Sequence, residues 1–229
     1  MPRDLADTTI VFDLDGTLID TAPDLAAATN HALGLLGLQP LDVMDLHPFI
    51  GHGSKAMIDA GLRFYKRSVE ENELNRLHDQ FLEFYAANVA VASRPFAGIP
   101  ELLDGLHGAG AQLAVCTNKM EHLSKVLLRA LGLERQFAAI AGRDTFDEFK
   151  PAPGHLTRTI AMAGGRPERA VMVGDSEVDL ATAIAARVPF IGVSFGYAQR
   201  PLIESNPGVI IDHYREFMGA LDRVLAGRA

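Results

Sequence analysis

Residues 8–20 read TTIVFDLDGTLID, a short β-branched and aromatic run that ends in two aspartates, Asp13 and Asp15. Such a run predicts a buried strand. Because an unpaired buried charge is costly, we expect both carboxylates where the strand leaves the core. Side chains alternate along a strand, so the two lie on the same side, where they repel each other unless a cation separates them or one holds a proton. Either a bound cation or a held proton would give the two aspartates a role in a chemical reaction.

The composition indicates a globular protein. The chain has 229 residues, 48% hydrophobic and 22% charged, enough for one large domain or a domain with an insertion. The net charge of -8 argues against nucleic acid or an anionic membrane as a partner, because both attract basic patches. A small molecule is the expected partner.

The single cysteine, Cys116, excludes an internal disulfide framework and a cysteine-based zinc site. The segment MPRDLADTT lacks the pattern of a signal peptide, and no apolar run reaches the roughly 18 residues of a membrane span. We therefore expect a cytoplasmic protein that does not engage a membrane, as a monomer or a homodimer.

The region after the first strand is predicted to be helical throughout. Thr21 and Pro23 are typical of a helix start, and apolar residues then recur at helical spacing. Helices are expected over 21–38, 43–46, 54–66 and 69–88. The sequence predicts an all-helical cap domain over residues 21–91, inserted into a core formed by residues 1–20 and 92–229.

From Pro95 onward, helices alternate with short apolar runs. Strands are expected over 112–116, 138–141, 170–173, 190–193 and 208–211. Helices are expected over 99–108, 121–131, 153–163 and 177–186, and from Tyr214. This alternation predicts an α/β fold, a Rossmann-like doubly wound and mostly parallel sheet covered on both faces.

Polar residues follow several of these strands. They are Asp13 and Asp15, the run Thr117-Asn118-Lys119, Lys150 after the strand at 138–141, and the run from Asp175 to Asp179. Ligands of parallel sheets bind beyond the carboxyl ends of the strands, so these groups should converge at one edge.

The motifs DLDGTL, CTN, FKPAP and GDSEVD resemble, in order and spacing, the four motifs of the haloacid dehalogenase-like hydrolase superfamily. The DxDGTL form and the helical insertion look most like the phosphoglycolate phosphatase-like group with a helical (C1-type) cap. The resemblance spans the whole chain and implies Mg²⁺-dependent phosphoryl transfer through an aspartyl-phosphate.

The resemblance gives the two catalytic aspartates different roles. Asp13 is expected to be the nucleophile, since carboxylates form covalent phosphoenzymes. Asp15 is expected to protonate the leaving alkoxide and then to accept a proton from water. With a metal beside Asp13, Asp15 remains without a counter-ion and can keep a proton. The structural alternative is an aspartate pair that only caps a turn.

Thr117, Asn118 and Lys150 are the expected phosphate-binding residues. A hydroxyl can donate to a phosphoryl oxygen, and an ammonium can neutralise its charge. The alternatives are a helix cap for Thr117, a loop-shaping role for Asn118 and an exposed lysine.

The resemblance implies that the metal is Mg²⁺, held by Asp13, the backbone carbonyl of Asp15, and Asp175. Mg²⁺ usually binds one or two carboxylates together with phosphate oxygens and water. Asp179 is expected to support the site by holding Lys150 or a metal-bound water. The alternative for Asp175 and Asp179 is a pair of charges at a helix N-terminus.

The predicted cap contains one candidate specificity loop, Ile50–Lys55. Gly51 and Gly53 bend the chain, and the next helix opens at Ser54. We expect Lys55, together with His52, to select a carboxylate on the leaving group. A glycine turn beside an exposed lysine is the plain alternative.

The sequence thus predicts a phosphatase of small phosphate monoesters, with 2-phosphoglycolate as the best single substrate. A sugar phosphomutase of the same superfamily is the alternative, since little in the core separates the two. A non-catalytic phosphate-binding module is the third hypothesis, and the four intact motifs argue against it.

Overall fold

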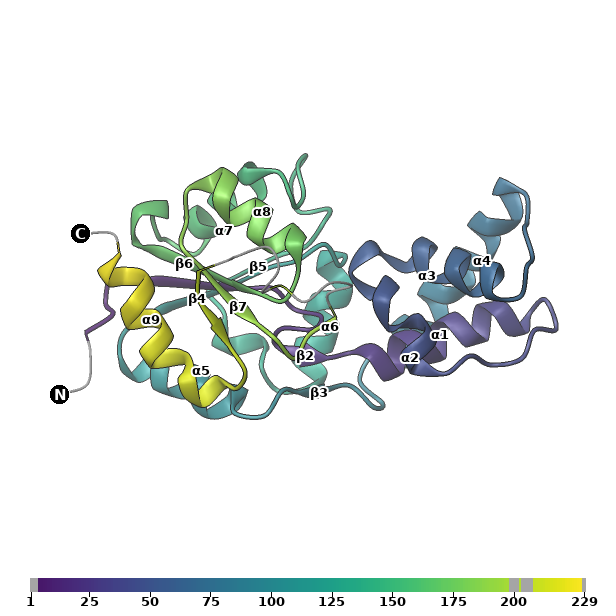
Figure 1. Cartoon of the computed structure of the whole chain (residues 1–229), viewed down its shortest axis with the longest axis horizontal. Helices are drawn as coiled ribbons and strands as arrows, with labels where there is room; N and C mark the ends of the chain where they lie inside the picture. Colours follow the sequence, from purple (N-terminus) through teal and green to yellow (C-terminus); the bar gives the residue numbers. More distant parts are fainter. Residues whose placement is uncertain (1–3, 198–201, 203–207, 228–229) are drawn as a thin grey trace.

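The computed structural model describes residues 4–197, 202 and 208–227. Figure 1 shows a sheet layered between helices, with four helices, α1–α4, grouped at one end of the molecule. Both termini lie at the opposite end.

The described part of the chain contains a six-stranded sheet in the order β5-β4-β1-β6-β7-β8. Each neighbouring pair in it is parallel. The prediction of a doubly wound, mostly parallel sheet is therefore confirmed. Its strands are β1 Thr9–Phe12, β4 Gln112–Cys116, β5 Ala139–Ala141, β6 Ala170–Gly174, β7 Phe190–Val193 and β8 Ile210–Ile211.

Strand β1 is central because its whole run is apolar enough to be buried on both faces. Phe12 pairs with Val115 of β4 and with Val173 of β6. The carboxyl ends of these three strands are therefore level, and the polar residues that follow them start from one edge of the sheet.

Helices cover both faces of the sheet. Ile10 and Phe12 belong to the core on one face, and Val11 to the core on the other, as strand alternation requires. The first face is covered by α5 Ile99–Gly108, α6 Glu121–Ala130 and α9 Phe217–Ala226. The second is covered by α7 Pro153–Met162 and α8 Glu177–Ala186. Short 3₁₀ turns connect elements at η2 Glu134–Gln136, η3 Pro167–Arg169 and η5 Tyr214–Glu216.

The helices between β2 Ile19–Asp20 and β3 Arg94–Pro95 pack mainly on one another. They are α1 Ala22–Gly34, α2 Val43–Leu46, η1 His47–His52, α3 Ser54–Phe64 and α4 Glu71–Ala87. Their inner faces carry buried apolar side chains such as Leu33, Ile58 and Phe81. We refer to α1–α4 as the cap helices.

Two adjacent crossings join the cap helices to the sheet. β2 Ile19–Asp20 and β3 Arg94–Pro95 form a short antiparallel pair. Asp24 of α1 is buried and ties them together, because its Oδ2 accepts hydrogen bonds from the Ser93 amide (2.8 Å) and hydroxyl (2.7 Å). In the described ranges, no helix is long and apolar enough to cross a membrane.

Candidate active site

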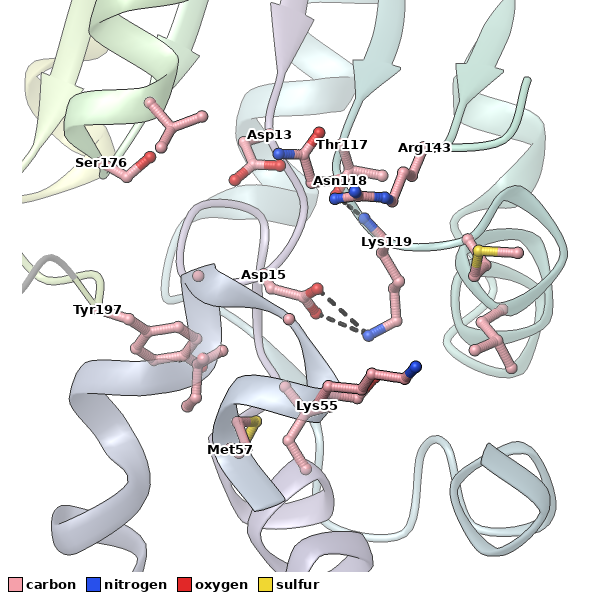
Figure 2. A pocket seen from close by; sticks show the side chains of 18 of the residues that line it. Asp13, Asp15, Lys55, Met57, Thr117, Asn118, Lys119, Arg143, Ser176 and Tyr197 are labelled. Atoms are coloured by element: carbon pink, nitrogen blue, oxygen red, sulfur yellow. Dashed lines mark hydrogen bonds and ion pairs between the residues drawn. The ribbon is translucent and has the colours of Figure 1, made fainter. Parts of the chain in front are cut away.

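A cavity of about 910 Å³ lies between the carboxyl edge of the sheet and the cap helices (Figure 2). The sheet side contributes the residues that follow the strands, and the cap side contributes residues of η1, α3 and α4. The predicted site residues that line it are Asp13, Asp15, Gly51, Lys55, Thr117, Asn118, Lys150 and Asp175.

Asp13 is the first residue beyond β1. Its amide continues the ladder by donating to the Val173 carbonyl (2.9 Å), and the residue is only 8% exposed. Its Oδ1 forms an ion pair with Lys150 Nζ at 2.8 Å. Burial raises the pKa of Asp13; Lys150 opposes that rise only in part, and Asp179 adds to it.

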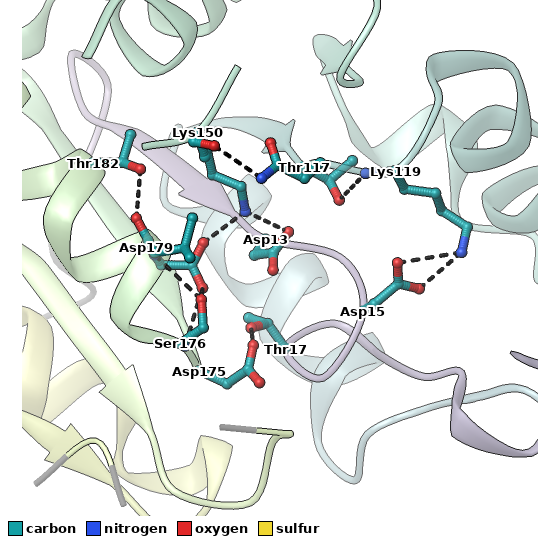
Figure 3. A network of polar contacts seen from close by, with 12 residues as sticks. Asp13, Asp15, Thr17, Thr117, Lys119, Lys150, Asp175, Ser176, Asp179 and Thr182 are labelled. Atoms are coloured by element: carbon teal, nitrogen blue, oxygen red, sulfur yellow. Dashed lines mark hydrogen bonds and ion pairs between the residues drawn. The ribbon is translucent and has the colours of Figure 1, made fainter. Parts of the chain in front are cut away.

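Lys150 is a buried cation between two carboxylates. Its Nζ lies 2.8 Å from Asp13 Oδ1 and 2.6 Å from Asp179 Oδ1 (Figure 3). Its backbone is held as well, because its amide donates to His155 Nδ1 (3.2 Å) and its carbonyl accepts from Asn118 Nδ2 (3.0 Å). The ammonium is therefore fixed rather than solvated.

His155 is the support beneath Lys150, and sequence reasoning gave it no role. It is completely buried in α7 and its Nε2 lies 3.1 Å from the Gly142 carbonyl. Burial and the nearby Lys150 lower its pKa to about 4. A neutral ring can accept from the Lys150 amide while donating to Gly142.

Asp175 follows β6 and is 4% exposed. Its Oδ1 accepts from the Thr17 hydroxyl (2.9 Å) and its Oδ2 from the Tyr197 amide (2.6 Å). The Tyr197 loop passes so close that a Cβ on Gly196 would lie 2.2 Å from Asp175 Cβ, so only glycine fits there. Burial, Asp179 and Asp13 raise the pKa of Asp175.

Asp179 is fully buried, and both its oxygens have donors. Oδ1 accepts from Lys150, and Oδ2 accepts from the Ser176 hydroxyl (2.6 Å) and amide (3.1 Å). The Ser176 amide contact and the Asp179 amide, which donates to Ser176 Oγ (3.3 Å), together form a capping box that fixes the start of α8. Asp179 thus holds Lys150 in place, one of the two supporting roles expected of it.

The charges at this edge suit a divalent cation. Asp13, Asp175 and Asp179 offer oxygens within 4.8 Å of one another. Three carboxylates face the single ammonium of Lys150, which leaves two negative charges uncompensated. Burial and the neighbouring carboxylates raise the pKa values of Asp13 and Asp175, as this excess of negative charge requires. Oxygen ligands of this kind are those that Mg²⁺ prefers.

Asp15 does not join this group of carboxylates. Its Oδ1 and Oδ2 accept hydrogen bonds from Lys119 Nζ at 3.0 and 3.2 Å (Figure 3). The expectation that Asp15 lacks a counter-ion is therefore wrong. The reason is that the Lys119 side chain is only 5% exposed, and a buried ammonium requires a carboxylate.

Thr117 and Asn118 lie beside Lys150, at the end of β4. Thr117 is 2% exposed, and its Oγ1 accepts from the Lys119 amide (3.2 Å). Asn118 uses its amide nitrogen on the Lys150 carbonyl, while its Oδ1 has no partner among the described residues. Both therefore shape the loop, and their phosphate-binding roles stay predictions.

The predicted specificity loop reaches the same cavity from the cap side. Gly51 and Lys55 line it, and Lys55 Nζ donates to Asn75 Oδ1 (2.7 Å) on α4. The side chain of His52 lies outside the described part of the chain. The role of this loop in selecting a carboxylate stays a prediction.

Sequence reasoning gave no site role to several lining residues, among them Tyr85, Lys119, Arg143 and Tyr197. Lys119 directly follows the Thr-Asn pair, which was a usable signal. Tyr85 has the spacing of an ordinary packing residue of α4, and neither Arg143 nor Tyr197 belongs to a motif.

The sequence model of the haloacid dehalogenase-like hydrolases matches residues 10–193. The chain belongs to this family. The match runs from β1 to β7 and so includes every strand end that delivers a polar residue to the cavity. The resemblance of the motifs to this superfamily is confirmed.

Named phosphatases of this hydrolase family are similar over most of their length. A phosphoglycolate phosphatase of Mesorhizobium japonicum is 48% identical, covering 90% of each chain. An N-acetylmuramic acid 6-phosphate phosphatase of Pseudomonas aeruginosa is 34% identical, covering 94% of this chain and 95% of that one. A crystal structure of a predicted phosphoglycolate phosphatase from Haemophilus somnus superposes with a TM-score of 0.86 at 29% identity, covering 94% and 97%.

Proposed function

We propose that this hydrolase is a Mg²⁺-dependent phosphatase of small phosphate monoesters that works through an aspartyl-phosphate. The observation that carries the proposal is the buried Asp13 carboxylate, held 2.8 Å from Lys150 Nζ at the wall of the cavity. A carboxylate beside a fixed cation can attack a phosphoryl group whose charge that cation neutralises.

In the first half of the proposed reaction, an Asp13 oxygen attacks phosphorus and the bond to the leaving oxygen breaks. Lys150 and the Thr117 hydroxyl stabilise the phosphoryl oxygens. Asp15, whose carboxyl also lines the cavity, gives its proton to the departing alkoxide. The products of this half are an alcohol and phosphorylated Asp13.

In the second half, water attacks the aspartyl-phosphate. Asp15 takes the proton of that water, the Asp13–phosphorus bond breaks, and inorganic phosphate leaves. Asp179 and His155 keep Lys150 aligned throughout, the first through its ammonium and the second through its backbone.

We assign the metal to Asp13, Asp175 and the backbone carbonyl of Asp15. The uncompensated negative charge of the carboxylate group supports this assignment. When bound, Mg²⁺ supplies positive charge that offsets the repulsion between nucleophile and phosphate.

We propose 2-phosphoglycolate as the substrate and residues 21–91 as the cap that selects it. Relatives at 48% and 44% identity, from Mesorhizobium japonicum and Agrobacterium fabrum, carry the name phosphoglycolate phosphatase. Cationic Lys55 and Lys119 line the cavity, which suits a substrate with a second anionic group. A cytoplasmic location and a monomer or homodimer stay part of the proposal, and the free, buried Cys116 suits a reducing compartment.

The test is a phosphate-release screen of the purified protein over metabolite monoesters, with Mg²⁺ and with EDTA. We expect Mg²⁺-dependent release from 2-phosphoglycolate above the sugar phosphates. Release that required a sugar bisphosphate activator would favour the phosphomutase alternative, and no release from any ester would contradict the proposal.

A further inference from the structure

We propose that Lys119 and Tyr85 form the subsite for the carboxylate of the leaving group, and thereby determine specificity. This inference rests on the proposed phosphatase function and assigns the second anion of the substrate to two residues outside the predicted site. It moves the main contact from the cap loop to the junction between the sheet and α4.

Lys119 is a buried cation that faces the cavity. Its side chain is 5% exposed, and it reaches from the loop after β4 across to Asp15 (Figure 2). Its Nζ lies 3.0 and 3.2 Å from the two oxygens of the Asp15 carboxylate, which holds the ammonium in place. Asp15 balances this charge, and an ammonium carries three N–H donors, of which Asp15 takes two.

Tyr85 brings the cap helices to the same point. Its ring lies under the ammonium, with Nζ 4.4 Å from the ring centroid, a cation–π contact between sheet loop and α4. Tyr85 is 1% exposed, and its hydroxyl is a buried atom without a hydrogen-bond partner among the described residues. Buried hydroxyls are normally satisfied, so this donor is available to a ligand in the cavity.

The position of Asp15 determines which part of the substrate meets Lys119. As proton donor to the leaving oxygen, Asp15 must lie within hydrogen-bond reach of it, about 2.6–3.2 Å. Lys119 Nζ lies 3.0 Å from the same carboxylate. A carboxylate on the carbon next to the leaving oxygen, as in 2-phosphoglycolate, therefore falls within reach of this ammonium.

Lys55 is less suited to be the principal contact. It lies on the exposed side of α3 and already donates to Asn75 Oδ1 at 2.7 Å. An exposed ion pair contributes little because water screens it, whereas a buried, charge-assisted contact discriminates strongly.

The test compares 2-phosphoglycolate with its neutral amide in wild type, Lys119→Met, Lys119→Arg and Tyr85→Phe. We expect the ratio of kcat/KM, acid over amide, to fall at least about 10-fold in Lys119→Met and several-fold in Tyr85→Phe. Lys119→Arg should keep most of the ratio. Lys125→Met on α6 and Tyr65→Phe at the end of α3 are the matched controls, since both side chains lie outside the cavity lining.

Lys119 also holds Asp15, so its removal lowers the turnover of both esters. The ratio of kcat/KM for the acid over that for the amide cancels this shared loss and reports specificity alone. A Lys119→Met ratio within about twofold of wild type would overturn the inference and leave the phosphatase function intact. If wild type cleaves neither ester, the proposed function fails, and calorimetric titration with the two esters then tests the subsite alone. Equal affinity of wild type and Lys119→Met for the acid would again overturn the inference about the subsite.

Discussion

At the scale of single residues, Asp13 is exposed to the cavity but otherwise buried, and its charge is balanced only in part by Lys150. We expect Asp13→Asn to lower turnover at least about 10³-fold, because an amide cannot form the acyl phosphate. Steady-state phosphate release measures this loss. The exposed Asp7→Asn is the control, and full activity in Asp13→Asn would contradict the mechanism.

His155 makes the stability of the folded protein depend on pH, in a direction that follows from its lowered pKa. Its folded-state pKa is about 4, below the ordinary value of 6.5, so the native state disfavours the charged ring. Its stabilising contribution is complete above pH 6.5 and is lost as the pH falls toward 4. We expect about 2–3 kcal/mol of the loss in unfolding free energy between pH 7 and pH 4.5 to come from this residue.

Urea unfolding at the two pH values measures that contribution. His155→Gln should be less stable at pH 7, because the Lys150 amide loses its partner, but should lose less stability on acidification. His107→Gln, at an exposed site, is the control. An equal acid-induced loss in wild type and His155→Gln would refute the assignment.

At the scale of elements, the start of α1 depends on a residue from the far end of the sheet. The Tyr197 hydroxyl accepts from the Thr21 and Ala22 amides (2.7 and 3.0 Å) and donates to Asp20 Oδ1 (2.6 Å), while the Tyr197 amide donates to Asp175. One residue therefore joins a proposed metal carboxylate to the first cap helix.

Tyr197→Phe keeps the amide contact and removes the hydroxyl. We expect a loss of about 1–3 kcal/mol in stability, since two buried amides lose their acceptor. Hydrogen exchange at the Thr21 and Ala22 amides should quicken, and kcat/KM should fall through a changed cap position. Tyr65→Phe, whose hydroxyl donates to Gln39 at an exposed site, is the matched control. Unchanged exchange at α1 would show that the contact carries no such role.

At the scale of the whole molecule, the carboxylate group makes stability depend on metal and pH together. Burial raises the pKa values of Asp13 and Asp175, so the native state keeps protons that the unfolded chain releases, and metal-free stability falls as pH rises above the ordinary carboxyl range. A cation reverses this penalty by binding the deprotonated forms.

We therefore expect saturating Mg²⁺ to raise Tm by about 5–10 °C at pH 8 and by less at pH 5.5. Differential scanning fluorimetry with Mg²⁺ and with EDTA measures both shifts. Asp175→Asn should lose most of the shift at pH 8 and be more stable than wild type in EDTA. A larger Mg²⁺ effect at pH 5.5 would contradict the assigned group.

The alternation of helices and apolar runs was sufficient to predict the sheet, because buried parallel strands leave a direct pattern in the sequence. The motifs likewise identified the strand ends, and the pairing of Lys150 with Asp179 was among the expected roles. The partner of Asp15 was not predictable in this way. Lys119 reaches Asp15 from a turn, and a turn leaves no periodic pattern in the sequence. Tyr85 contacts Lys119 only because α4 folds back over the edge of the sheet.

The cap helices are inserted between β1 and its two partner strands. A long stretch of chain therefore separates β1 from both partners. Thr9–Phe12 pairs with β4 at residues 112–115 and with β6 at residues 170–173. Contacts within 22–87 are short-range by comparison, and local contacts form faster. On the ribosome, the cap helices can therefore assemble before β1 has paired with the strands that fix the position of Asp13. Pulse-labelling during refolding should protect amides of α1–α4 ahead of those of β1, which would make catalytic competence the last property this chain acquires.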